Sequence, residues 1–97
     1  MVIILKKHNL TYTINKDDNE LIIEQGKAIF IESELIAEDY DLIKKGELTK
    51  VFINAFKIQI ENDLESIELG INDDDIINVV LYTQECFSIY NELLNCI

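Results

Sequence analysis

The chain has 97 residues and a mass of 11.2 kDa, and its 19 acidic side chains outnumber 8 basic ones, so the formal net charge is −11. About 48% of the residues are hydrophobic, which excludes the composition of a disordered acidic tail. The excess of acid also argues against binding nucleic acid directly through its phosphates, because such binding needs a basic face. These values predict a single domain over residues 1–97 with one core.

The first third of the chain is predicted to form strands. Residues 2–6 are a short apolar run, and residues 10–14 alternate strictly between apolar and polar side chains. This alternation is typical of a strand with one buried face, which would hold Leu10, Tyr12 and Ile14.

Two further apolar runs follow a segment that favours a turn. Residues 15–19 are rich in Asn and Asp, and the runs at 21–23 and 28–31 flank Gly26 in the manner of a hairpin. We therefore expect a small antiparallel sheet of three to four strands within residues 2–31.

The remaining two thirds predict helices packed on that sheet, so the fold class is α+β. Ser33 suits the N-cap of a first helix, which Gly46 would end. Gly70 would end a second helix, and Asn72 with the three aspartates after it marks the start of a third. The expected helices are about three in number and cover residues 34–45, 47–69 and 73–96.

The second predicted helix changes its apolar face along its length. Leu48 and Phe52 lie on the apolar side of its first half, whereas the same directions carry polar residues in its second half. There the apolar positions shift to Ile60 and Leu64. A straight helix cannot bury both sets against one partner, so we expect a bend, a break or an end that overhangs the core.

The third predicted helix has two apolar seams, more than one buried face requires. The seams suit a helix placed between the sheet and either the other helices or a second copy of the protein. The first seam holds Ile76, Val80, Thr83, Phe87, Tyr90, Leu94 and Ile97. The second seam, which is the expected interface if the protein is a homodimer, holds Val79, Tyr82, Cys86, Ile89 and Leu93.

Charge is unevenly distributed along the sequence. Residues 1–31 hold four acids and four lysines, whereas residues 32–97 hold fifteen acids and four lysines, and there is no arginine. The predicted helical part therefore carries the whole net charge of −11. Such a surface serves either solubility alone or attraction to a positively charged partner.

Motifs for catalysis and for metal binding are absent from the sequence. His8 is the only histidine and falls in a predicted turn, and no glycine-rich phosphate loop is present. The aspartates at 73–75 lack the spacing and the central glycine of a calcium-binding loop. We expect a protein that is not an enzyme, with no catalytic residue, no metal and no cofactor.

The sequence predicts a cytoplasmic protein. Its first residues do not follow the pattern of a signal peptide, and no apolar run approaches the length of a membrane span. Cys86 and Cys96 would be about 15 Å apart along one helix, too far to pair with each other. Two reduced, partly buried thiols are the expected state, with an intermolecular disulfide or a redox role as the alternative.

The order of strands and helices, the acidity and the lack of catalytic motifs resemble the small phage-encoded inhibitors of bacterial defence nucleases, such as anti-CRISPR proteins. Residues 52–57, Phe-Ile-Asn-Ala-Phe-Lys, are similar to a helical stretch in one acidic member of that class. This similarity assigns no functional residue to the present chain. The resemblance implies that clustered carboxylates mimic nucleic acid and occupy the basic channel of a nuclease.

We therefore expect an inhibitor that binds a basic protein, either a nuclease or a toxin, and does not bind nucleic acid or membranes itself. One alternative is an antitoxin or immunity protein that neutralises a single cognate toxin, and another is a non-inhibitory dimeric module. The expected partner-binding residues lie on both sides of Gly70, and they are Glu61, Asp63, Glu65, Glu68, Asp73, Asp74 and Asp75.

Overall fold

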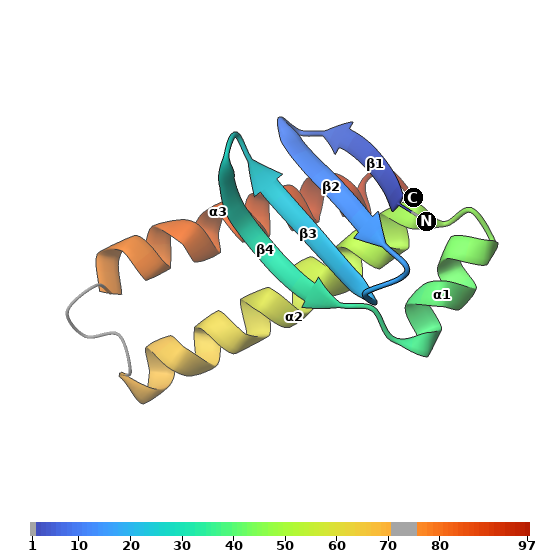
Figure 1. Cartoon of the computed structure of the whole chain (residues 1–97). Coiled ribbons are helices and arrows are strands. Elements are labelled where there is room, and N and C mark those ends of the chain that lie inside the picture. Colours follow the sequence, from blue (N-terminus) through green and yellow to red (C-terminus); the bar gives the residue numbers. More distant parts are fainter. Residues whose placement is uncertain (1, 71–75) are drawn as a thin grey trace. The chain divides into compact units, whose positions relative to one another are not determined.

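The computed structural model describes residues 2–70 and 76–97, in which four antiparallel strands are followed by three helices (Figure 1). The predicted α+β fold is therefore confirmed. The chain divides into two compact units, Met1–Leu48 and Thr49–Ile97. The first holds the sheet and one helix, and the second holds the two long helices. The expectations of a single domain and of helices packed on the sheet stay predictions.

The sheet of the first unit has its strands in sequence order, and each strand pairs with the next. The prediction of strands ending at residue 31 is wrong at one end, because the last strand continues for three more residues and carries Glu32 and Glu34. The strands are β1 (Val2–Lys7), β2 (Leu10–Asn15), β3 (Glu20–Gln25) and β4 (Ala28–Glu34).

Two-residue turns set the hairpins at one end of the sheet. His8 and Asn9 join β1 to β2 with φ angles of 56° and 61°, the pair of positive values that defines a type I′ turn. The expected turn at His8 is thus confirmed. Gly26 opens the turn between β3 and β4 with φ of 63°, a conformation in which a side chain would be strained.

One face of the sheet is apolar and buried, as the alternation along β2 predicts. The side chains of β2 are alternately buried and half-buried, and those of β3 follow the same pattern. The opposite face carries threonine, asparagine and glutamate, together with the half-buried Ile22. Among the side chains of this unit whose burial the structure describes, the buried ones are Leu10, Tyr12, Ile14, Leu21, Ile23, Ile31 and Leu35, together with Asp39.

Helix α1 (Ala37–Lys44) begins three residues later than predicted, and Ser33 does not cap it. Ser33 lies on β4, and the N-cap is Ile36, whose backbone N–H donates to the Asp39 carboxylate at 3.0 Å. Asp39 therefore supplies the half of a capping box that comes from the third helical position.

The end of α1 at Gly46 is confirmed. The N–H of Gly46 donates to the carbonyl of Ile43 at 3.0 Å, and the N–H of Glu47 donates to the carbonyl of Leu42 at 2.9 Å. These two bonds form a Schellman motif, which requires a left-handed residue at the position of Gly46, and its φ is 74°.

Helix α1 is tied to the turn between β2 and β3. The hydroxyl of Tyr40 donates to the Asn19 side-chain carbonyl, and the carbonyl oxygen of Lys16 is 3.4 Å from the same hydroxyl. The N–H of Leu35 donates to the carbonyl of Asn19 at 2.8 Å. This turn is therefore held from the strand side and from the helix side.

Helix α2 (Leu48–Leu69) opens the second unit and is one continuous helix of 22 residues, which excludes the predicted break. None of its residues after Ile60 is buried, and Leu64 is 46% exposed. Its last nine residues therefore hold no buried side chain, as expected for the overhanging end that the sequence allows. The buried residues are Val51, Phe52, Ile53, Ala55, Phe56 and Ile60.

Helix α3 (Ile76–Leu94) is described from its fourth predicted residue, and it ends two residues before the predicted end. Its predicted start at residues 73–75 lies outside the described residues. Within the part of the chain that the structure describes, no helix combines the length and the apolarity needed to span a bilayer.

Candidate functional site

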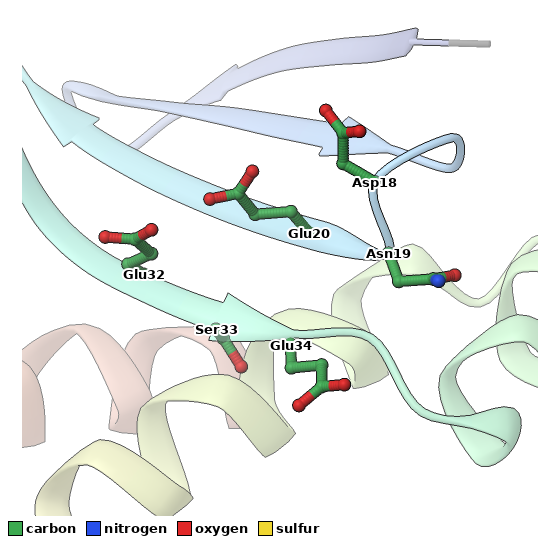
Figure 2. A pocket seen from close by; sticks show the side chains of 6 residues that line it. All are labelled: Asp18, Asn19, Glu20, Glu32, Ser33 and Glu34. Carbon is green, nitrogen blue, oxygen red and sulfur yellow. The ribbon is translucent and has the colours of Figure 1, made fainter.

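Three carboxylates gather on the exposed face of the first unit and form what we call the sheet cluster: Asp18, Glu20 and Glu32. In Figure 2 these three side chains point to the same side of the strands, and that of Ser33 points to the other. The cluster borders an open pocket of about 390 Å³ with no basic side chain among the six residues that line it. The lining residues are Asp18, Asn19, Glu20, Glu32, Ser33 and Glu34.

The turn after β2 fixes the position of Asp18. The Asn15 side-chain carbonyl accepts the backbone N–H groups of Asp17 at 3.1 Å and of Asp18 at 3.4 Å. The Asn15 amide donates to the Asp18 carboxylate at 3.0 Å. This Asx turn holds one carboxylate at the start of β3, beside Glu20.

The carboxyls of Glu20 and Glu32 contact each other. A side-chain hydrogen bond with Glu32 raises the pKa of Glu20 above its usual value, and partial burial and the negative charges of Glu32 and Asp18 raise it further. Two carboxylates that share a hydrogen bond need a proton between them, so one of the pair retains its proton more readily than an isolated glutamate does. The cluster therefore favours the arrival of a positive charge.

A β-bulge brings Glu20 and Glu32 to the same face. Near the turn Gln25 is opposite Ala28, but the register shifts by one residue between Ile23 and Glu24, and beyond it Ile22 is opposite Glu32. Without the shift, Glu32 would be opposite Leu21 and share the buried face with it. Glu34 is opposite Glu20 in the shifted register, at the end of β4.

Of the predicted partner-binding residues of α2, three are exposed to solvent and one, Asp63, is half-buried. Glu61, Glu65 and Glu68 are exposed, and they are spaced four and three residues apart, so they lie on one side of the helix. Asp73, Asp74 and Asp75 lie outside the described residues, so their expected convergence with these glutamates stays a prediction.

Asp63 differs from its acidic neighbours because it is half-buried between the helices of the second unit. One of its carboxylate oxygens accepts the Gln59 amide at 3.0 Å, and the other is buried with no hydrogen-bond partner among the described residues. Burial raises its pKa, and the bond from Gln59 opposes that shift. Burial raises the pKa of both Tyr82 and Cys86, and the negative charge of Asp63 raises both further, so α3 passes close to Asp63.

The two cysteines are free in the structure, as expected. Cys86 is buried, and burial raises the pKa of its thiol to about 11, with the Tyr82 hydroxyl acting in the opposite direction through a hydrogen bond. A thiol with that pKa is almost fully protonated at neutral pH and is a poor nucleophile. No group of three or more potential ligands that could hold a metal ion occurs among the described residues.

The two seams of α3 differ in exposure. Cys86, Ile89 and Leu93 of the second seam are buried within one chain, so a dimer through them would require that they be uncovered first. Phe87, with 40% of its surface exposed, belongs to the first seam, as do Leu94 and Ile97, which are also exposed. The predicted dimer interface stays a prediction.

Sequence reasoning missed the sheet cluster because it assigned Glu32 to the segment after the sheet. With β4 extended to Glu34, residues 1–34 hold six acids and four lysines and have a net charge of −2. The remaining residues have a net charge of −9. The prediction that only the helical part is acidic is therefore corrected.

Comparison of the chain with models of protein families, with curated proteins and with solved structures gave no match.

Proposed function

We propose that this protein is an inhibitor that binds and blocks a basic, nucleic-acid-binding surface on another protein, such as a nuclease of a host defence system. The observation that carries the proposal is the row of exposed glutamates on α2, Glu61, Glu65 and Glu68. The net charge of −11 without a single arginine supports it.

The glutamate row on α2 destabilises the helix through repulsion between its charges, and solubility alone does not require charges placed so close together. Glutamates four residues apart on a helix repel each other, and such pairs destabilise a helix by about 0.2–0.5 kcal/mol. The same number of charges dispersed over the surface would serve solubility without this repulsion. A continuous line of negative charge does, however, steer a protein to a positive groove and raise its association rate.

The sheet cluster adds a second exposed concentration of carboxylates, on the other unit of the chain. Crowding at Glu20 is relieved when a cation approaches, as the raised pKa of this carboxyl indicates. Both features favour a basic partner and disfavour nucleic acid, whose phosphates would be repelled.

The proposal is tested by capture and displacement. The immobilised protein is mixed with host lysate at low salt, and bound proteins are eluted with duplex DNA. We expect a basic nucleic-acid-binding protein to be released by DNA and by raised salt, because all three compete for the same surface. A captured protein that DNA does not displace would contradict the proposal and favour an antitoxin or immunity protein.

Two variants of equal net charge locate the surface. Glu61→Gln/Glu65→Gln removes two carboxylates from the α2 row, and Glu38→Gln/Asp41→Asn removes two exposed carboxylates from α1. We expect the first to capture several-fold less partner than the second. Equal capture by both variants would show that only total charge matters and would contradict a binding role for the row.

A further inference from the structure

The outer edge of β4 is open to another strand. The described strands form a sheet in the order β1, β2, β3 and β4, so β4 pairs only with β3. In the structure Ala28, Ile29, Glu32 and Glu34 are exposed, and Ile29 exposes 60% of its surface. Figure 1 shows β4 at the margin of the sheet.

The hydrogen-bond pattern shows which backbone groups face that margin. The N–H of Leu35 donates to the carbonyl of Asn19, so these two residues form a hydrogen-bonded pair. In an antiparallel ladder such pairs alternate with pairs whose N–H and C=O groups point away from each other. The pairs Glu20–Glu34 and Ile22–Glu32 belong to the second kind. The backbone groups of Glu32 and Glu34 therefore point away from β3, toward the open edge.

The charge on this edge selects among the strands that could pair with it. Charged side chains on an edge strand prevent it from pairing with another copy of the same chain. Here the charge is only negative, since Glu32 lies in the sheet cluster and the adjoining pocket has no basic side chain in its lining. The edge thus repels a second copy of this acidic protein and attracts a basic segment.

We propose that the outer edge of β4, at Glu32 and Glu34, is a docking site for an extended segment of a partner protein that carries lysine or arginine at alternate positions. The inference rests on the proposed function for the basic character of the partner. The added strand would bond to the outward N–H and C=O groups of Glu32 and Glu34. Its basic side chains would lie on the same face as Glu20 and Glu32. The added strand would be about 5 Å from β4, which carries Glu32.

The test uses the intact protein and a synthetic peptide in which lysine alternates with valine. Amide hydrogen exchange is followed by NMR with and without the peptide. We expect exchange at Glu32 and Glu34 to slow at least several-fold on binding, because their N–H groups gain acceptors, whereas Ser33, already bonded to β3, changes little. Unchanged exchange at Glu32 and Glu34 in the presence of saturating peptide would overturn the inference.

Two control peptides separate strand pairing from simple charge attraction. The same peptide with alternate backbone nitrogens methylated keeps every charge but cannot form a strand ladder, so we expect it to bind without protecting Glu32 and Glu34. A glutamate–valine peptide should not bind. Equal protection by the methylated or the acidic peptide would contradict the inference, as would protection that grows with protein concentration alone, which would indicate pairing between copies.

The Glu32→Gln variant tests the contribution of charge while keeping the backbone N–H. We expect it to bind the lysine–valine peptide about two- to five-fold more weakly, the range of one cross-strand charge pair. The Glu38→Gln variant, altered on α1, should bind as the unmodified protein does. A failure of the peptide experiments leaves the capture experiment unaffected, so the edge inference and the proposed function fail independently.

Discussion

At the scale of single residues, the contact between Glu20 and Glu32 is the clearest electrostatic feature of the sheet. We predict that the Glu20 carboxyl titrates above its ordinary value of 4.5, because its hydrogen bond with Glu32 and the nearby charge of Asp18 favour the protonated form. Carboxyl chemical shifts followed by NMR as the pH is lowered would measure this midpoint.

The Glu32→Gln variant provides the matched comparison for that titration. Removing the neighbouring charge should lower the midpoint of Glu20 toward 4.5, whereas Glu38→Gln on α1 should leave it where it is. A midpoint that does not respond to Glu32→Gln would show that the two carboxyls are not in contact.

Asp63 is a second residue whose environment disfavours its charge. Since burial raises its pKa in the folded state, the folded protein binds this proton more tightly than the unfolded chain does. The stabilising effect of protonation is complete below the unfolded value near 3.8 and is lost as the pH rises through the folded value. At neutral pH the charged Asp63 therefore reduces stability.

We predict that Asp63→Asn raises the melting temperature at pH 7 by about 2–4 °C, corresponding to about 0.5 kcal/mol once solvent screening of this half-buried group is allowed for. The asparagine can still accept the Gln59 amide. The difference from the unmodified protein should disappear near pH 3, where both side chains are neutral. Thermal unfolding followed by circular dichroism at the two pH values measures it, and a gain that persists at pH 3 would contradict the account.

At the scale of elements, the start of α1 depends on Asp39. Its carboxylate accepts the backbone N–H of Ile36 and is buried, with 7% of the residue exposed. We predict that Asp39→Ala destabilises the protein by about 1 kcal/mol, the usual effect of losing a helix cap. Asp39→Asn, which keeps an acceptor, should cost less.

Ser33→Ala is the informative control for that prediction. Ser33 is on β4 and makes no cap to α1, so its loss should change the free energy of unfolding by less than about 0.5 kcal/mol. Chemical denaturation of the three variants would measure these differences. A larger loss of stability on replacing Ser33 than on replacing Asp39 would contradict this assignment and favour Ser33 as the N-cap.

The boundary between β4 and α1 shows what sequence patterns can and cannot supply. Ser33 followed by an acidic residue is a good helix-start signal, and nothing local distinguishes it from the true start at Ile36. The position of the helix start depends on the pairing of β4 with β3, because this pairing extends the strand to Glu34. The residues up to Glu34 are therefore held in the strand and cannot begin the helix. Pairing between distant residues outweighs a local propensity here.

The β-bulge had the largest consequence for the candidate site. A two-residue turn at Gly26 alone predicts a register in which Glu20 is opposite Ser33, whereas the observed shift places it opposite Glu34. The bulge turns Ile31 to the buried face beside Ile23, and it moves Glu32 to the exposed face with Glu20. Burial of the apolar pair supplies a reason for the shift, but no single residue in the sequence marks its position.

The ends of the helices were more predictable because their signals are local. Gly46 and Gly70 follow the ends of α1 and α2, and the polar change after Ile60 matches the loss of burial along α2. The half-buried position of Asp63 was not predictable in this way. Its neighbours Tyr82 and Cys86 are about twenty residues away, and only the pairing of the two helices brings them together.

At the scale of the whole molecule, the account depends on how −11 charges are distributed. The exposed glutamates of α2 and the carboxylates of the sheet belong to different units of the chain. Repulsion within each is unfavourable to folding, and it is offset when a cationic surface is bound. This distribution of charge is the basis on which we propose a basic partner.

The central claim is that the carboxylate row on α2 attracts that partner. Its most direct test is the rate constant for association with the captured partner, measured by stopped flow between low and high ionic strength. We predict a steep fall in rate with added salt, and a flatter and slower profile for Glu61→Gln/Glu65→Gln than for Glu38→Gln/Asp41→Asn. An association rate that is independent of salt and the same for both variants would contradict the claim.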